Sequence, residues 1–227
     1  YSIGQNFGYR IDYSNGNGYI NTQEELDKAL ATYQVGGTPR MGDFLYVDLN
    51  EDGIIDEKDQ APIKYSDIPR ITYGFSGSVN WKNFDFSFLF SGIAKASRLY
   101  AGWGATEFAN VGFFSDYHLQ AWTPERFANG EEILYPALGS APGTSQKPND
   151  FFIMDRSFLR LKNIELGYTL PKGLLKKVGI NSTRIYVNGN NLLTWKAMKT
   201  DVIDPEQGSD LNYPITKMVN FGINVTF

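Results

Sequence analysis

The stretch Met218-Val-Asn-Phe-Gly-Ile-Asn-Val-Thr-Phe227 is the most informative part of the sequence about the fold. Apolar side chains alternate in it with polar or small ones, and successive side chains of a strand point to opposite faces of a sheet. One face of this strand is therefore apolar and the other polar. A strand of a soluble antiparallel sheet can carry this pattern, whereas a strand of a membrane barrel needs it, with its apolar face toward lipid.

Other segments alternate in the same way. They are the residues around Ile3–Tyr9, Ile71–Trp81, Phe84–Phe90, Phe158–Leu170 and Thr183–Thr194. Between Leu161 and Ile164 the apolar phase shifts, which predicts a β-bulge near Asn163. Together with the C-terminal stretch, these segments predict an all-β, antiparallel fold of about six strands.

The connections between these segments alternate between short and long. Lys82-Asn83 is a two-residue turn and Pro171–Ser182 is about a dozen residues, whereas the long connections cover roughly 13–69, 93–156 and 195–217. Long structureless loops are uncommon in compact soluble domains, but transmembrane barrels combine short periplasmic turns with long external loops. We therefore expect a transmembrane β-barrel segment with long extracellular loops, in which Phe44–Val47 belongs to the first loop and not to a spanning strand.

Composition narrows the function classes. The chain has no Cys and a single His, which excludes disulfides, thiolate metal sites and cysteine nucleophiles. Its net charge of -4, without a basic block, argues against a nucleic-acid partner. It has no apolar run of about 18 residues that could form a transmembrane helix. It opens on Tyr1-Ser-Ile-Gly without a signal peptide, so we expect a mature protein or a fragment.

The loop from Asp48 to Asp59 matches the calcium-binding loop of EF-hands. Gly53 at the sixth position permits a sharp turn, and Asp56 at the ninth would act through water. The twelfth position is an Asp and not the longer Glu, which departs from EF-hands and resembles dockerin loops. We expect a structural calcium site, and the alternative is an acidic turn without an ion. The predicted ligands are the side chains of Asp48, Asn50, Asp52 and Asp59 and the carbonyl of Ile54.

Two further features lie in the long connections. Residues Asn21–Thr32 predict a short helix, because Thr22 and Glu25 form a capping box. Aromatic residues crowd the second long loop, where they could stack on sugars, although packing within the loop or against a lid protein is the favoured interpretation. These aromatic residues are Trp103, Phe108, Phe113, Phe114 and Tyr117.

Nothing in the sequence favours an enzyme. His118 lacks the partners that a catalytic or zinc site would need, so we expect a packed or surface histidine. The carboxylates lie mostly in the calcium-type loop or in turns, and no pair stands out for glycoside hydrolysis. Trp81 and Trp195 fall near opposite strand ends, where barrels carry aromatic belts.

The chain resembles the C-terminal portion of SusC/RagA-type TonB-dependent outer-membrane transporters of the Bacteroidetes. The terminal aromatic Phe227 fits this family, whereas Tyr13–Tyr19 departs from the shorter stretch that the family more often has there. The stretches that carry the resemblance are Gly42–Asp56, Pro69–Phe75, Trp81–Phe86, Ala121–Glu125, Ser157–Tyr168 and Asn188–Leu192.

The resemblance implies active import of oligosaccharides or peptides across the outer membrane of a Gram-negative bacterium. It implies energy supplied through TonB, a SusD-like surface lipoprotein as a cap, and a barrel of about 22 strands around a plug. The plug and the other strands are absent from residues 1–227, so the expected partners are that remaining segment, TonB through the plug, the lipoprotein and membrane lipid. The alternative is a soluble, calcium-stapled β-sandwich that binds carbohydrate, and a third interpretation is a purely structural surface protein.

Overall fold

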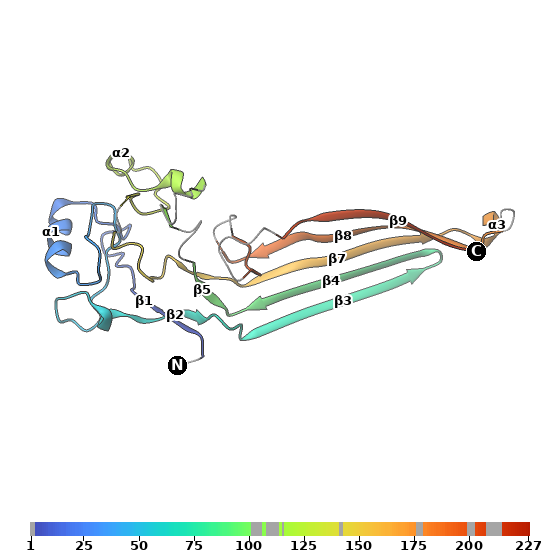
Figure 1. The fold of residues 1–227 in the computed structure, drawn as a ribbon, viewed down its shortest axis with the longest axis horizontal. Helices are drawn as coiled ribbons and strands as arrows, with labels where there is room; N and C mark the ends of the chain where they lie inside the picture. Colours follow the sequence, from blue (N-terminus) through green and yellow to red (C-terminus); the bar gives the residue numbers. More distant parts are fainter. Residues whose placement is uncertain are drawn as a thin grey trace.

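The computed structural model consists of two parts that lie end to end (Figure 1). One is a long antiparallel sheet. The other, here called the loop unit, is formed by the described residues before Ile71 and between Ala94 and Phe158. The structure describes residues 3–100, 106–107, 114, 116–140, 143–175, 179–198, 203–207 and 215–227.

The long sheet is a five-stranded meander. Its order is β3-β4-β7-β8-β9, and every neighbouring pair is antiparallel. The strands follow one another along the chain, so each connection joins two neighbours. Their bounds are β3 Ile71–Trp81, β4 Phe84–Ala94, β7 Phe158–Thr169, β8 Ser182–Lys196 and β9 Met218–Thr226.

The prediction that the segment around Ile3–Tyr9 is a sixth strand of this sheet was wrong. Its residues form β1 (Gln5–Gly8), which pairs with β2 (Ala61–Ser66) in a separate two-stranded sheet of the loop unit. Tyr9, directly after β1, is 2% exposed in the core of that unit. Of the apolar residues of this segment, Tyr9 packs into that core, whereas Phe7 is 40% exposed and Ile3 86%.

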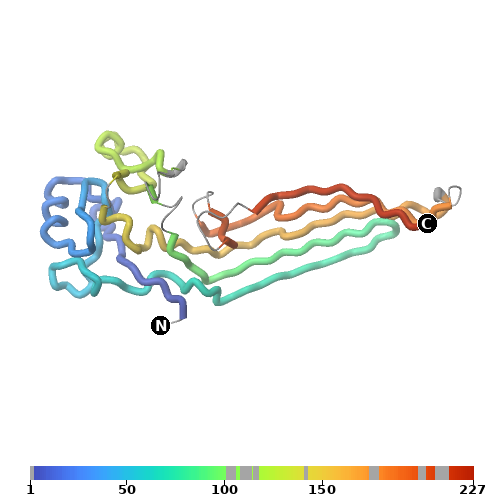
Figure 2. The backbone as a smooth tube through the Cα atoms, in the orientation of Figure 1, coloured from blue at the N-terminus to red at the C-terminus, as the bar shows by residue number. Residues whose placement is uncertain are grey.

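Short and long connections lie at opposite ends of the sheet, as predicted. Lys82-Asn83 joins β3 to β4 with Trp81 opposite Phe84, and Lys82 has a positive φ of 54°. The β7–β8 connection, with the short helix α3 (Lys172–Leu175), lies at the same end, here called the turn end (Figure 1). The loop unit lies at the other, the loop end. Figure 2 shows the N-terminus beside the loop unit and the C-terminus at the turn end.

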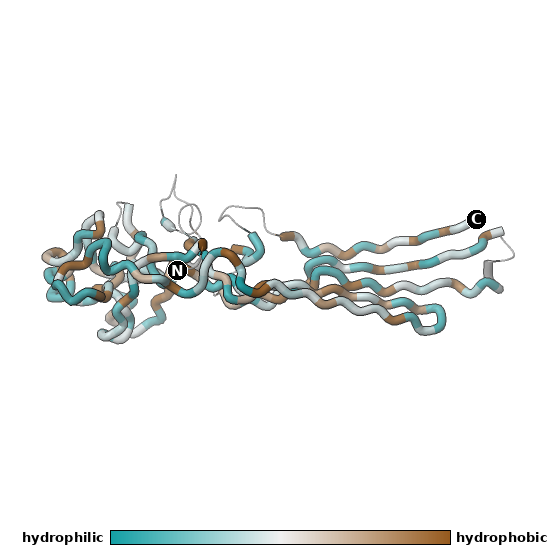
Figure 3. The backbone as a smooth tube through the Cα atoms, turned by 90° about the horizontal axis from the view of Figure 1, so that it is seen from below, coloured by the Kyte–Doolittle hydropathy of each residue, from teal (hydrophilic) through white to brown (hydrophobic). Residues whose placement is uncertain are grey.

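The register separates the side chains of the sheet into an apolar face and a polar face. Figure 3 shows the molecule from below, with hydrophobic and hydrophilic residues alternating along the strands. Val79, Phe86, Leu166, Val187 and Phe221 form one row across all five strands of the apolar face. The next row, on the polar face, is Ser78, Ser87, Glu165, Asn188 and Asn220.

A bulge interrupts β7 where the sequence predicts one. The pairing with β8 shifts between Leu161 and Asn163, and the pairing with β4 shifts at the same level. Relative to β4, Lys162 is the extra residue of β7. On the β8 side, two residues, Asn191 and Leu192, face Lys162, and Asn191 has a positive φ of 54°. The bulge keeps Leu161 and Ile164 on the apolar face although they are three residues apart.

The loop unit holds the remaining described helices and strands. The predicted capping box of its first helix is present, since Thr22 accepts from the backbone of Glu25 and the Glu25 carboxylate accepts from the backbone of Thr22. No helix in the described part of the chain is long and apolar enough to cross a membrane. The elements are α1 Gln23–Thr32, η1 Glu57–Asp59, β5 Ser97–Leu99, η2 Asp116–Gln120, α2 Pro124–Ala128 and β6 Ile153–Asp155.

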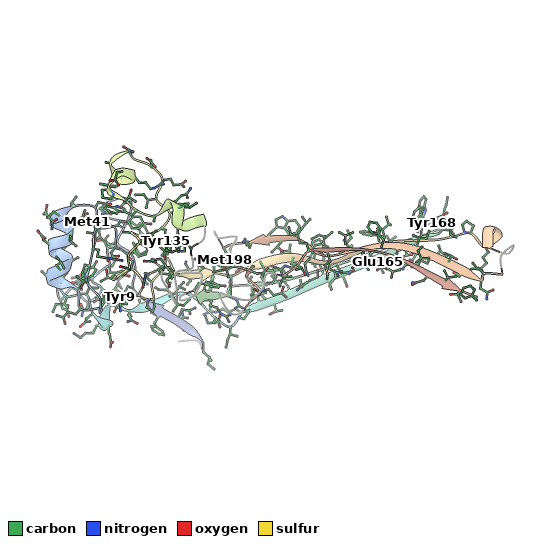
Figure 4. All side chains as sticks on the ribbon, turned by 45° about the horizontal axis from the view of Figure 1, so that its top comes forward. Tyr9, Met41, Tyr135, Glu165, Tyr168 and Met198 are labelled. Carbon is green, nitrogen blue, oxygen red and sulfur yellow. The ribbon has the colours of Figure 1, made fainter. Side chains whose placement is uncertain are left out.

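An aromatic core holds the loop unit together. Phe44 and Tyr46 are 2% and 5% exposed there, and neither belongs to a strand of the long sheet. Tyr46 donates a hydrogen bond to the carbonyl of Thr144 (2.8 Å), which joins the first long connection to the second. Tyr9 and Tyr135 belong to the same core, and Figure 4 labels both within the loop unit.

Candidate functional site

The apolar face of the sheet is the first candidate site, because its side chains stay exposed. Val79 is 57% exposed and Phe221 84%. A β-sandwich would bury this face under a second sheet, but the described strands form no layer over it (Figure 3). An apolar surface of this extent marks a contact with lipid or with another protein.

Aromatic residues mark both ends of the apolar face. Trp81 at the turn end is 63% exposed, and Trp195 at the loop end is 52% exposed, which places them at opposite ends as predicted. Near Trp195, the Tyr73 hydroxyl donates to the Phe158 carbonyl (2.8 Å) across β4. Gly92 makes this possible, since a Cβ there would lie 2.8 Å from the Tyr73 ring.

The polar face carries a charged cluster toward the turn end. Arg184 on β8 forms ion pairs with Asp85 on β4 and with Glu165 on β7 (2.6 Å to the latter). Gly167 lies between these side chains, where a Cβ would collide with the Arg184 guanidinium. Next to the cluster, the side-chain amide of Asn220 donates a hydrogen bond to that of Asn188 (2.9 Å).

The loop from Asp48 to Asp59 turns sharply at Gly53. Its first carboxylate, Asp48, accepts the N–H of Gly53 (2.8 Å), which has a positive φ of 85°. The last, Asp59, is fully buried and accepts the N–H groups of Leu49 and Asp56 (both 2.8 Å).

The middle of the loop is held by its own polar groups. The carboxylate of Asp52 accepts hydrogen bonds from the backbone N–H of Ile54 and from the side-chain amide of Asn50. These hydrogen bonds, the one from Ile54 most of all, hold the pKa of Asp52 below its ordinary value. The Lys58 ammonium lies 3.5 Å from Asp52 and 3.2 Å from Asp56. A bound cation would have to replace this ammonium as the partner of these carboxylates.

The predicted ligands do not form a ready acidic cage. No three Asp, Glu or His side chains in the described ranges are grouped in a way that could hold a metal ion. The buried Oδ1 of Asp48, however, has no hydrogen-bond partner among the described atoms. An oxygen of this kind fits a cation, because an unpaired buried carboxylate oxygen is costly.

Comparison with known proteins identifies the family. No model of a known protein family matches the chain. TonB-dependent receptor P26 of Formosa agariphila is 32% identical over 92% of this chain, and TonB-dependent receptor SusC of Bacteroides thetaiotaomicron is 27% identical over 96% of it. The chain belongs to the SusC/RagA-type TonB-dependent receptors. It spans 22% of the length of P26 and 20% of SusC, so it corresponds to about a fifth of such a receptor.

Solved structures agree with this family. The RagAB peptide transporter matches with a TM-score of 0.63 and 27% identity, over 85% of this chain and 22% of that one. RagAB in the 'open-open' state matches with a TM-score of 0.61 over the same share of this chain. These SusC/RagA-type relatives are named as receptors and transporters and not as enzymes, in line with the prediction of a non-enzymatic protein.

The structure describes only some of the other residues that the sequence of this SusC/RagA-type segment singled out. His118 is packed in the loop unit at 3% exposure, with its ring 4.5 Å from that of Tyr135. Phe114 is 52% exposed and lies 5.7 Å from His118, ring to ring. Trp103, Phe108, Phe113 and the side chain of Tyr117 lie outside the described residues.

Sequence reasoning missed the charged clusters of the polar face in this SusC/RagA-type chain. Arg184 and Asp85 are 99 residues apart in the sequence and meet only through the sheet register. The available signal was that both occupy polar positions inside alternating strands. A charge at such a position needs a partner when its face is enclosed.

Proposed function

We propose that the chain is one section of the wall of an outer-membrane β-barrel importer in a Gram-negative bacterium. The observation that carries this proposal is the long sheet, whose apolar face is exposed and whose opposite face is polar across all five strands. In the proposed arrangement the apolar face meets lipid and the polar face meets the barrel interior. Homology to TonB-dependent receptors over nearly the whole chain supports it.

The dimensions of the sheet support the same arrangement. On β8 the apolar face extends from Ile185 to Trp195, ten residues apart. At about 3.3 Å per residue and a tilt of about 40°, this span rises roughly 25 Å, which equals the height of the apolar band of outer-membrane barrels. The turn end then faces the periplasm and the loop unit faces outward.

The proposed cargo is a large nutrient, either an oligosaccharide or a peptide. RagAB is named a peptide transporter, whereas the name of the relative SusC states no cargo. The proposed partners are the remaining barrel strands and plug of the receptor, TonB through the plug, a SusD-like lipoprotein over the loop unit, and lipid. Among the described strands, β3 and β9 each have one neighbour, so both outer edges need further strands.

Co-purification tests this proposal. The receptor is tagged within this chain in its native host, the outer membrane is extracted with detergent, and the bound proteins are identified. We expect the chain only in the detergent extract, together with a plug-bearing barrel portion and a SusD-like lipoprotein. A detergent-independent monomer without these partners would contradict the importer and favour the soluble carbohydrate-binding module.

We also propose that the loop from Asp48 to Asp59 holds a structural calcium ion. The partnerless Oδ1 of Asp48 and the turn at Gly53 support it. Calorimetric titration of the detergent-solubilised receptor with calcium tests it. We expect Asp48→Asn to weaken binding about tenfold, because fewer charged ligands lower the affinity.

The control for calcium binding is Glu51→Gln. It removes one charge from the same loop, at a position that provides no ligand, and its side chain is exposed. We expect it to leave the calcium affinity unchanged. Equal affinities of Asp48→Asn and the unaltered receptor, or no saturable uptake by the latter, would refute the calcium site.

A further inference from the structure

A buried arginine on the polar face holds a segment that follows β8. Arg160 on β7 is 1% exposed, and its Nε donates to the Thr194 hydroxyl on β8 (2.8 Å). Its two other nitrogens bind the carboxylates of Asp204 (2.5 Å) and Glu206 (2.6 Å). The guanidinium therefore bridges the sheet and the segment Ile203–Gln207, here called the strap.

The bulge in β7 adds a second cation to the same contact. Lys162, the extra residue of the bulge, donates to both carboxylate oxygens of Glu206 (2.6 and 2.7 Å). Two cations of the sheet thus meet two anions of the strap, and the contact is neutral overall. Pro205 lies between the two acidic residues and restricts the backbone of the strap.

The strap is also tied to the loop unit at both of its ends. Ile203 is 4% exposed in a cluster with Tyr100 and Met198. The carbonyl of Gln207 accepts a hydrogen bond from Arg98 (3.5 Å). Contacts to the sheet and to the loop unit together fix its position.

The register shows which face the strap covers. Arg160 pairs with Ser91 on β4 and with Thr194 on β8, so it belongs to the polar face near the loop end. Figure 4 shows Met198 at the junction of the sheet and the loop unit, with Glu165 and Tyr168 far along the sheet. The strap therefore lies over the polar face close to the junction with the loop unit.

We propose that the strap narrows the outer mouth of the import path, and that Arg160 is the positioning residue that holds it there. The inference rests on the proposed function, because it takes the polar face as the barrel interior. Without Arg160 or Glu206 the strap leaves the face, and larger molecules reach the polar side chains below it.

Labelling of single cysteines in the receptor, in native outer membranes, tests the strap. Any cysteines in the rest of the receptor are first replaced, whereas this chain contributes none. Ser78→Cys places a thiol on the polar face, on the turn side of the strap. A large polyethylene-glycol maleimide is added from outside. In Arg160→Gln and in Glu206→Gln, we expect it to label the thiol at position 78 about tenfold faster than in the unaltered receptor. The reason is that each variant loses hydrogen bonds between charged groups that hold the strap over the polar face. A small maleimide should react at an unchanged rate.

Two controls separate the possible failures. Glu165→Gln removes a carboxylate from the same strand and face but contacts Arg184 and not the strap, so it should leave labelling unchanged. Val79→Cys, the neighbour of Ser78 on the apolar face, should stay protected from both reagents. If it reacts freely, the barrel proposal itself fails.

The strap proposal fails, and the barrel proposal stands, if Val79→Cys is protected while Arg160→Gln and Glu206→Gln leave the labelling rate at position 78 unchanged. It also fails if Glu165→Gln accelerates labelling as much as they do. Should Arg160→Gln not assemble, Glu206→Gln decides, because its side chain is 34% exposed and its loss leaves the sheet intact.

Discussion

Replacing Val219 by Arg tests whether the apolar face meets lipid. Val219 is 55% exposed and pairs with Gly189, inside the span from Ile185 to Trp195 on β8. An arginine facing lipid near the bilayer midplane costs about 2–4 kcal/mol of folding free energy. At an exposed position in water, the same replacement changes stability by about 0.5 kcal/mol or less.

Asn220→Arg is the matched control, because the next residue of β9 points to the polar face. It loses the hydrogen bond to Asn188, worth about 1 kcal/mol. Denaturant titration of the receptor in lipid vesicles gives the folding free energy of each variant. We expect a loss of about 2–4 kcal/mol for Val219→Arg and of about 1 kcal/mol or less for Asn220→Arg. Equal losses would refute the assignment of the two faces.

Three further predictions concern local structure. Gly92→Ala should destabilise the receptor by about 1–3 kcal/mol in denaturant titration, because the new methyl group collides with the Phe158 carbonyl and with the Tyr73 ring. Thr22→Ala should cost about 1 kcal/mol, measured in the same way, since the capping hydrogen bond is lost. Hydrogen bonds from Arg98 hold the pKa of Asp67 below its ordinary value. Their stabilisation is therefore present above the ordinary carboxyl pKa, about 3.9, and is lost as the pH falls through the lower folded-state pKa. Unfolding midpoints of Asp67→Asn and of the unaltered protein should differ at neutral pH and converge in acid, and a difference that persists unchanged would contradict this.

The elements that the sequence predicted correctly depend on local patterns. The alternation of Ile71–Trp81 and of the C-terminal stretch assigns faces directly, and Lys82-Asn83 fixes the register of its hairpin. The bulge near Asn163 was visible as a phase shift within one strand. Each of these signals lies within a few residues of the structure that it specifies.

The failures concern partners that lie far away in the sequence. The segment around Ile3–Tyr9 alternates, but alternation does not say whether a strand pairs in the long sheet or with β2 in the loop unit. Arg160 and Asp204 are 44 residues apart, and the pattern of β7 gives no sign of the strap. Calcium binding by the loop from Asp48 to Asp59 stays a prediction.

A nitroxide scan along β9 tests the central claim most directly. Spin labels are placed singly at residues 218 to 226 of the receptor in lipid vesicles, and their collisions with oxygen, which dissolves in lipid, and with a water-soluble nickel complex are measured. We expect a period of two residues, with oxygen favoured at Val219, Phe221 and Ile223 and nickel at Asn220 and Asn224. Equal exposure of both faces to nickel would contradict a membrane wall.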